Sequence, residues 1–218
     1  MSQCCPAIGD SAADYFGAAR AEHDLAVYRA DGPGRTTRGL LAGIAASGIR
    51  PSTVLDIGSG IGTMSFELLD AGAAGATCVD LSPAFAKFGS IEAVRRGVAE
   101  RITWRTTDFV TVAPDLPPAE LVILDRVVCC YPAFDALLQQ AADHAVVLLA
   151  MSYPRDRWYV RAAFAAENLV RKLRRRAFRA FVHSPARMDA ILAGAGLRRL
   201  RTESTMMWQM DIYRRAAS

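Results

Sequence analysis

A single segment, from Thr53 to Gly62, constrains the fold of this chain more than any other. A short apolar run passes through Asp56 and leads into glycines at every second position, beginning with Gly58. Glycine lacks a Cβ and adopts backbone conformations that other residues avoid, which lets a turn bend tightly and approach a ligand. The segment therefore predicts a strand, a tight turn and the start of a helix, which is the repeating unit of an open α/β sheet.

The next strand and the glycine spacing narrow the kind of ligand. A second apolar run ends in Asp80, eighteen residues after Gly62, and a carboxylate at that point typically binds an adenosine ribose. Dinucleotide sites place their third glycine one residue further along, where the helix begins that holds the pyrophosphate. Thr63 occupies that position here, and Asp56 would repel a pyrophosphate but suits a cationic amine.

This combination resembles motif I of the class I S-adenosylmethionine (SAM)-dependent methyltransferases. The resemblance covers about residues 52–151 and, more loosely, a C-terminal hairpin. It implies SAM as cofactor and a Rossmann-like α/β fold, with a seven-stranded, mostly parallel sheet, helices on both faces and an antiparallel last strand. The aromatic pair Tyr15-Phe16 with Tyr28, followed by an Arg-rich insert at about 154–182, resembles magnesium-protoporphyrin O-methyltransferases and quinone-ring methylases.

Apolar periodicity and turn residues place the other elements. We expect helices over residues 10–30, 36–47, 62–71, 83–96, 132–142 and 185–194. We expect strands over residues 52–57, 76–80, 101–106, 120–125, 144–151, 197–204 and 206–214. Strands that alternate with helices form a sheet covered on both faces. We therefore expect an N-terminal helical cap over residues 1–50 and a SAM-binding domain over residues 51–218.

The resemblance also implies which residues contact the cofactor. Asp56 would lie near the amino group of SAM, and Asp80 would accept hydrogen bonds from the ribose hydroxyls. Leu81 would lie against the adenine. The glycine turn would pass under the methionine and ribose with Gly58, Ser59, Gly60 and Gly62.

Two later strand ends complete the expected site, because ligands of such sheets bind beyond the carboxyl ends of the strands. Asp108 and Phe109 resemble the adenine clamp of the family, although Asp108 taken alone is a cap or turn residue. Asp125 and Arg126 follow the fourth strand, where the methionine end of the cofactor meets the acceptor. Asp125 would contact SAM, orient the acceptor or pair with Arg126.

Catalysis of methyl transfer from a sulfonium mainly requires alignment of the acceptor, and a base helps only a protonated acceptor. His183 precedes the last helix on the ligand side and is the candidate base, unless it merely precedes a helix start. Asp125 and Arg126 join it as candidate catalytic residues. His144 begins a strand at the opposite end of the sheet and is expected to be structural, while His23 lies over the site or on the surface.

Two missing motifs restrict the acceptor. The fourth strand is not followed by Asp/Asn-Pro-Pro-Tyr, the motif with which nucleic-acid amino-methylating enzymes are recognised, so we expect no nucleic acid partner. The fifth strand ends in Met151, Ser152 and Tyr153 rather than in the acidic metal ligands of catechol methyltransferases. We therefore expect no metal requirement.

The Arg-rich insert leaves several interpretations open. Residues 155–179 carry nine Lys or Arg and two acidic residues. An apolar stripe with helical spacing runs through Trp158, Ala162, Ala165, Leu169 and Leu173. The insert is a solvated helix packed by one face, a lid whose arginine holds an anionic acceptor group, or a basic amphipathic helix in peripheral membrane contact. RNA binding is less favoured, because no aromatic stacking platform is present.

Composition limits the setting of the protein. No apolar run approaches the ~20 residues that cross a bilayer, and the N-terminus lacks the features of a signal peptide, so we expect a cytoplasmic protein. Five cysteines comprise Cys78 and the adjacent pairs Cys4-Cys5 and Cys129-Cys130, and we expect reduced thiols. They are either buried small residues or four thiols that meet at a metal or a thiophilic substrate.

The function expected from these features is methyl transfer from SAM to a small-molecule acceptor, preferably on oxygen, by direct in-line substitution without metal. Methylation of sulfur or nitrogen and a non-catalytic SAM-binding module are alternatives. An NAD-dependent oxidoreductase is disfavoured by the glycine spacing, by the more than fifty residues before the first strand, and by the lack of a Tyr-x-x-x-Lys pair. The acceptor and the oligomeric state stay open.

Overall fold

The computed structural model describes residues 15–216 of the 218-residue chain. Residues 10–14 of the expected helix 10–30 and the Cys4-Cys5 pair lie outside the described residues. Residues 15–17 are not helical as expected, because Gly17 has an extended backbone and the helix starts at Ala18. Within these residues, no helix has the length and apolarity needed to cross a bilayer.

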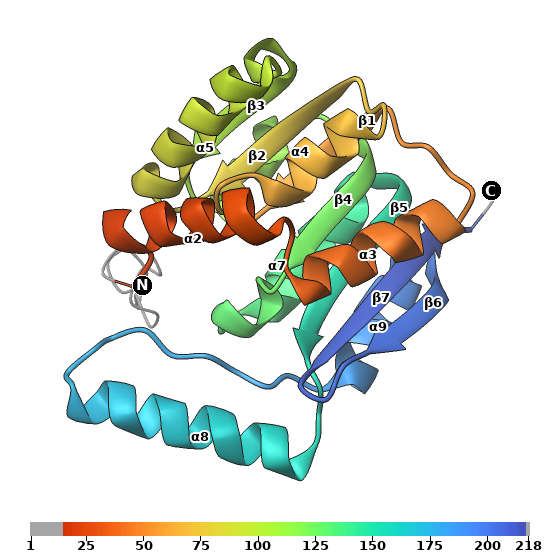
Figure 1. Cartoon of the computed structure of the whole chain (residues 1–218). Helices are drawn as coiled ribbons and strands as arrows, with labels where there is room; N and C mark the ends of the chain where they lie inside the picture. The colour runs from red at the N-terminus through yellow and green to blue at the C-terminus, as the bar shows by residue number, and fades with distance from the viewer. Residues whose placement is uncertain (1–14, 217–218) are drawn as a thin grey trace.

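A seven-stranded sheet with the order β3-β2-β1-β4-β5-β7-β6 forms the centre of the molecule (Figure 1). Neighbouring strands from β3 to β5 pair in parallel, whereas β7 is antiparallel to both β5 and β6. The strands are β1 (Thr53–Ile57), β2 (Gly75–Asp80), β3 (Ile102–Thr106), β4 (Ala119–Asp125), β5 (Ala145–Pro154), β6 (Leu197–Ser204) and β7 (Trp208–Arg215). The fold class expected from the sequence is confirmed.

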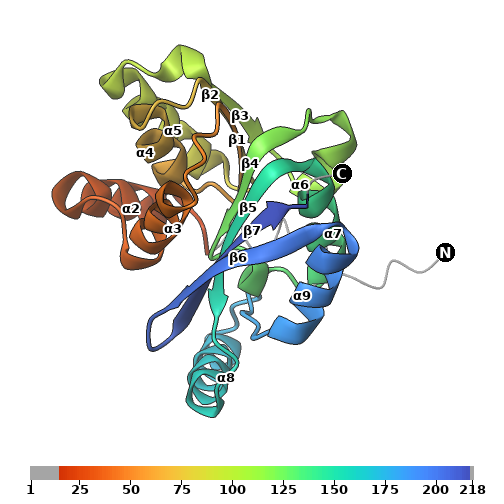
Figure 2. The ribbon, with the colours of Figure 1, turned by 90° about the vertical axis from the view of Figure 1, so that its right-hand side faces the viewer.

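Helices cover both faces of this sheet (Figure 2). One face carries α2 (Ala18–Asp31), α3 (Arg35–Ala46), α4 (Thr63–Asp70) and α5 (Pro83–Arg96). The other carries α6 (Phe109–Val112), α7 (Phe134–His144) and α9 (Pro185–Gly194). Three short 3-10 helices are η1 (Ala99–Arg101), η2 (Ala113–Asp115) and η3 (Val128–Cys130). The Arg-rich insert forms α8 (Trp158–Leu173), which stands away from the sheet beyond the end of β5 (Figures 1 and 2).

Alternate residues of the strands point to opposite faces, so the sheet separates two apolar cores. Leu121 and Ile123 of β4 join the core under α2–α5, whereas Val122 and Leu124 join the core under α6, α7 and α9. The N-terminal helices α2 and α3 contribute buried residues to the first core together with α4 and α5. They therefore pack as part of the α/β body.

Element boundaries agree with the sequence expectations most closely where capping residues are unambiguous. Ser82 accepts a hydrogen bond from the backbone N–H of Phe85 and precedes Pro83, so α5 begins where the N-cap pattern predicts. Strand β5 continues to Pro154, three residues past the expected end, because its residues 148–154 pair with β7. Such pairing depends on a distant segment and leaves no local signal.

A buried carboxylate ties α2 to α5. Glu92 is fully buried and accepts hydrogen bonds from Arg95 at 2.5 Å, Arg96 at 3.0 Å and Arg29 of α2 at 2.9 Å. The hydrogen bond from Arg95, followed by those from Arg96 and Arg29, holds the pKa of Glu92 at about 2 despite its burial. This cluster fixes α2, which covers one side of the sheet at the end where a ligand would bind.

We predict that Glu92→Gln lowers the free energy of unfolding at pH 7 by about 1–3 kcal/mol, because three charge-assisted hydrogen bonds from partly exposed arginines lose their charge. The pKa of Glu92 is depressed in the folded state, so this contribution is present above pH 4.5 and is lost as the pH falls towards 2. Urea unfolding at several pH values measures it. The exposed Glu100→Gln is the matched control, and a pH-independent difference for Glu92→Gln would contradict the assignment.

Candidate functional site

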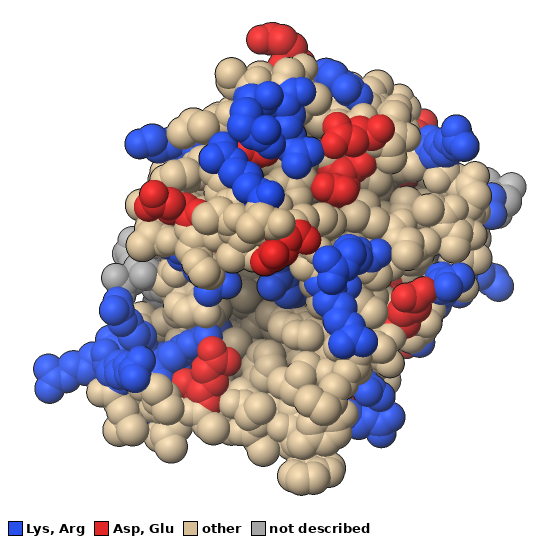
Figure 3. All heavy atoms as spheres, viewed as in Figure 1, with Lys and Arg blue, Asp and Glu red and all other residues tan. Residues whose placement is uncertain are grey.

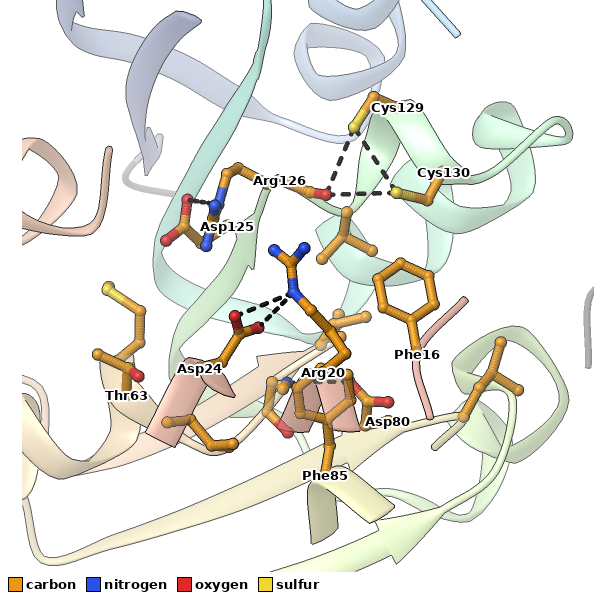
Figure 4. Close-up of a pocket in the computed structure, with 18 of the residues that line it drawn as sticks. Phe16, Arg20, Asp24, Thr63, Asp80, Phe85, Asp125, Arg126, Cys129 and Cys130 are labelled. Carbon is orange, nitrogen blue, oxygen red and sulfur yellow. Dashed lines mark hydrogen bonds and ion pairs between the residues drawn. The ribbon is translucent and has the colours of Figure 1, made fainter. Parts of the chain in front are cut away.

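One cavity of about 630 Å³ opens at the carboxyl ends of the parallel strands, where the strand order reverses between β1 and β4. Ligands of doubly wound sheets bind at this switch point. Four carboxylates from successive strands line it, namely Asp56 near the end of β1, Asp80 at the end of β2, Asp108 after β3 and Asp125 at the end of β4. Figure 4 shows Asp80 and Asp125 on either side of Arg20.

The glycine turn after β1 brings the backbone close to this cavity. Gly58 and Gly62 have φ angles of 62° and 86°, in the left-handed region that favours glycine. A Cβ on Gly58 would come within 2.4 Å of a methyl carbon of Val127. Between them, the hydroxyl of Ser59 is buried and lies against the buried thiol of Cys78.

Asp80 is held by backbone donors. Its carboxylate accepts hydrogen bonds from the N–H groups of Gly60 at 2.9 Å and Ser82 at 2.8 Å. Burial raises the pKa of Asp80, and the two backbone hydrogen bonds oppose that rise. Leu81, the next residue, also lines the cavity. The turn and the end of β2 are therefore joined through one carboxylate.

Asp56 is the most deeply buried acid of the four. It is 2% exposed and accepts a hydrogen bond from the hydroxyl of Ser65 at 2.9 Å. Burial raises the pKa of Asp56 to about 7; the Ser65 hydrogen bond opposes this rise, and the charges of Asp125 and Asp80 add to it. No cation accompanies Asp56 in the hydrogen bonds and ion pairs of the described residues.

Asp108 and Phe109 both line the cavity but differ in their surroundings. Asp108 caps α6 through the backbone N–H of Val110 at 3.0 Å, which agrees with its interpretation as a cap. The same oxygen accepts the hydroxyl of Tyr131 at 2.5 Å. Burial, the hydrogen bond to Asp108 and the charge of Asp108 raise the pKa of Tyr131, so it stays a neutral donor. Phe109 is buried and packs edge-on against His144.

Asp125 is fixed by two hydroxyls. Its oxygens accept hydrogen bonds from Thr37 of α3 at 2.6 Å and from Ser152 of β5 at 2.5 Å. Arg126 has a φ of 62°, which is unusual for a residue with a Cβ and is found at functional sites. Its N–H donates to Ser152 at 2.9 Å, and its guanidinium lies 3.9 Å from Asp125 (Figure 4).

Sequence reasoning does not identify Thr37, Tyr131 or Ser152, although each orients a predicted carboxylate. Thr37 lies on a helix before the first strand, and nothing local connects it to Asp125. In the sequence, Ser152 is recognisable only as a non-acidic residue at the end of a strand. Its polarity inside an apolar β5 segment is the one signal that could have found it.

The Cys129-Cys130 pair lines the cavity beside Arg126 (Figure 4). The two sulfurs are 3.7 Å apart, and both thiols donate to the carbonyl of Arg126. The hydrogen bond between them raises the pKa of Cys129 and lowers that of Cys130, which the charges of Arg171 and Arg126 lower further. Cys78 is buried and hydrogen-bonded to a hydroxyl, as a small core residue. The hypothesis that four thiols meet involves Cys4-Cys5, outside the described residues.

The three histidines occupy different places. His144 contacts the carbonyls of Gln140 and Ala113, as expected of a structural residue. His23 lies at the exposed edge of the cavity. His183, the predicted base, is not among the cavity-lining residues of the described chain; its Nε2 lies 3.1 Å from the carbonyl of Tyr131. Burial lowers the pKa of His183. We therefore assign no catalytic contact to His183.

The N-terminal segment and the insert form the roof of the cavity. Tyr15 and Phe178 stack at 4.6 Å, and the guanidinium of Arg171 lies 4.8 Å from both rings. Arg171 is 9% exposed, and its Nη2 donates to Glu167 and Tyr15. Its Nη1 is buried with no hydrogen-bond partner in the described part of the chain. Figure 3 shows the molecule hollowed between the part over α8 and the body.

Phe16, Arg20 and Asp24 extend this roof above the ends of β1 and β2. Arg20 forms an ion pair with Asp24 at 2.9 Å, and Figure 4 shows both side chains at the centre of the cavity. The sequence places Phe16 on an amphipathic helix without connecting it to a site. A helix before the first strand can cover the ligand end of a sheet only through tertiary packing, so spacing could not reveal this role.

Comparisons with known proteins agree with this geometry. A family model described as a methyltransferase domain matches residues 54–147. A comparison with curated protein sequences finds no match.

Among the 202 described residues, no cluster of three or more His, Cys, Asp or Glu could hold a metal ion.

Several solved structures share the fold. Magnesium protoporphyrin IX methyltransferase from Synechocystis PCC 6803, crystallised with S-adenosylhomocysteine (SAH), matches with a TM-score of 0.74 and 22% identity over 94% of this chain and 98% of its own. An O-methyltransferase family protein from Burkholderia thailandensis matches with a TM-score of 0.71 and 16% identity, over 95% of this chain and 62% of its own. An O-methyltransferase family 2 protein from Planctomyces limnophilus in complex with apigenin matches with a TM-score of 0.61 and 16% identity, over 85% of this chain and 63% of its own.

We predict that Asp56→Asn stabilises the folded protein above pH 7 by a few kcal/mol, since one pKa unit corresponds to about 1.4 kcal/mol. The pKa of Asp56 is raised from 3.8 to about 7 on folding, so the wild type loses stability as the pH rises between these values, and the amide does not. Thermal unfolding from pH 5 to pH 8 measures the effect. Asp115→Asn, at the exposed end of η2, is the control. A gain that is equal at all pH values would argue against a raised pKa.

Proposed function

We propose that this chain, which contains a class I SAM-dependent methyltransferase domain, methylates a small-molecule acceptor. The methylated atom in this proposal is oxygen. The family and the fold expected from the sequence are confirmed by the domain match and by the shared sheet. The acceptor, the methylated atom and the roles of individual residues belong to the proposal.

One observation carries the cofactor assignment: four carboxylates and a glycine turn converge on one cavity. In the proposal, Asp80 accepts the ribose hydroxyls and Asp56 faces the cationic amino group. The turn from Gly58 to Gly62 passes under the methionine and ribose. Leu81 and Asp108 bind the adenine, with Phe109 supporting Asp108 from the core.

The residues of the chain then supply binding, orientation and exclusion of water. SAM supplies an activated methyl group, so the protein needs chiefly to align the acceptor. Asp125, held by two hydroxyls, orients the acceptor or the methionine end, and Arg126 lies beside it. The roof formed by Tyr15 and α8 limits access of water. No base is assigned, because an acceptor that arrives ionised requires none.

The roof favours an acceptor with an apolar body and an anionic group. Tyr15, Phe16 and Phe178 give the cavity an aromatic wall. Arg171 offers a buried Nη1 without a partner among residues 15–216, and a carboxylate would satisfy it with a charge-assisted hydrogen bond. One similar structure is a complex with apigenin, which is consistent with a flat acceptor. An oxygen nucleophile fits this chemistry, and methylation of sulfur or nitrogen is the second candidate.

We predict that Asp80→Ala weakens SAM binding by about 1.5–3 kcal/mol, the usual value for hydrogen bonds to a charged group. Isothermal titration calorimetry with SAM and with SAH measures it, and Asp115→Ala serves as a carboxylate control remote from the cavity. The same titration with NAD tests the oxidoreductase alternative. Unchanged SAM affinity would mean that the ribose lies elsewhere.

For catalysis, we predict that SAH forms with an oxygen acceptor from a panel of phenols, carboxylic acids and thiols, and that EDTA leaves the rate unchanged. Arg171→Met should reduce kcat/KM for carboxylate-bearing acceptors by about tenfold or more relative to neutral phenols, whereas Arg171→Lys retains the charge and should lose less. SAH production measured by mass spectrometry tests both. If no acceptor of the panel leads to SAH formation, the non-catalytic SAM-binding module is favoured.

A further inference from the structure

The side of α8 that faces away from the cavity carries an apolar stripe in contact with solvent. We call it the outer stripe; it consists of Trp158, Ala162, Ala165, Leu169 and Leu173, all of which are exposed. Trp158 is 80%, Leu169 57% and Leu173 74% exposed. Within the described residues the one ring contact of the outer stripe is the edge-on contact of Trp158 with the neighbouring Tyr159. The helix does pack by one face, but the outer stripe is not that face.

The opposite side of α8 fixes the orientation of the helix. Val160 is buried, and Phe164 and Arg171 line the cavity. Asn168 exchanges two hydrogen bonds with the backbone of Ala180, at 2.7 and 3.0 Å, which clamp α8 to the segment that follows it. A rotation that buried the outer stripe would break these contacts. The stripe therefore stays outside in the folded monomer.

The apolar surface continues beyond α8. Met206, in the turn between β6 and β7, is 71% exposed, and its carbonyl accepts a hydrogen bond from Tyr159 at 3.0 Å. This contact places Met206 beside the first turn of α8. Contiguous exposed apolar surfaces on soluble proteins commonly mark an interaction site.

Positive charge surrounds the outer stripe. Lys172 and Arg161 flank it at helical spacing, Arg161 in an ion pair with Asp156, and the exposed Arg174 and Arg175 follow its C-terminal end. Residues 155–179 contain nine Lys or Arg against two acidic residues. Figure 3 shows a largely uncharged surface over α8 and a cluster of blue at the C-terminal end of the helix. The partner should therefore be both apolar and anionic.

We propose that the outer stripe and Met206 bind the surface of an anionic lipid bilayer, with α8 lying in the plane of the interface. Amphipathic helices with basic flanks bind in this way, and Trp is favoured at the interface. Each basic residue near an anionic surface strengthens the attraction. A second copy of the chain is a poorer occupant, because a two-fold contact through α8 would bring the same basic residues of both copies together.

The position of α8 connects this surface with the cavity. One side of the helix lines the roof, and the other would lie in the bilayer interface. On the proposed function, an amphiphilic acceptor would then enter the cavity from the lipid surface without crossing water. The lipid contact itself does not depend on methyl transfer.

Vesicle co-sedimentation tests the proposal with the full chain. Vesicles of phosphatidylcholine with phosphatidylglycerol should bind the protein, phosphatidylcholine alone should bind it far less, and added salt should weaken binding. Leu169→Gln with Leu173→Gln should lower the partition coefficient by about tenfold or more. Lys172→Gln, Arg174→Gln and Arg175→Gln together should remove the preference for the anionic lipid.

Matched controls come from α5, whose Ile91 and Val94 are 49% and 69% exposed. Ile91→Gln with Val94→Gln should bind vesicles like the wild type, and melting temperatures should show that every variant folds. Absence of binding to anionic vesicles at low salt would overturn the proposal, as would unaltered binding by the Leu169 and Leu173 variant. A dimer in analytical ultracentrifugation that this variant dissociates would assign the stripe to a second copy instead. SAM titration, measured separately, tests the proposed function.

Discussion

The crowding of four carboxylates at the ends of four strands is the constraint on which this structure depends. Like charges in a partly buried site disfavour one another, and burial already disfavours each charge. Burial raises the pKa of both Asp56 and Asp80, and the charges of Asp125 and Asp80 add to the rise for Asp56. The hydroxyls of Thr37 and Ser152 donate to different oxygens of Asp125 and hold it without neutralising it. A cationic ligand would relieve this conflict, which is the physical basis of the proposed cofactor site.

One helix, α8, belongs both to the roof of the cavity and to the surface that is proposed to bind lipid. The inner side of α8 brings Arg171 and Phe164 to the cavity, while the outer side presents apolar and basic residues to the surroundings. Substrate-facing parts of a fold vary while the sheet persists, which is why the fold alone does not identify the acceptor. Within the described chain, the unpartnered Nη1 of Arg171 is the feature that indicates most directly which chemical group the acceptor carries.

Much of the fold and half of the site could be predicted from the amino-acid sequence, for physical reasons. Strand periodicity, the glycine turn and an acidic residue at each strand end are local features, and parallel strands necessarily bring their carboxyl ends to one edge. Asp56, Asp80, Asp108 and Asp125 could therefore be assigned to one cavity from their positions in the sequence. The start of α5 was equally local, because Ser82 and the proline after it determine it.

Only the tertiary structure decided what lies above those strand ends. Thr37 and Tyr131 reach the carboxylates from segments far away in sequence, and no spacing rule connects them. His183 lies near the ligand side by sequence position, yet its ring packs against the backbone carbonyl of Tyr131, and His183 itself does not line the cavity. The stripe of α8 has the spacing of a packed face but stays exposed. Periodicity identifies a helix face, whereas contacts with distant segments decide which face is buried.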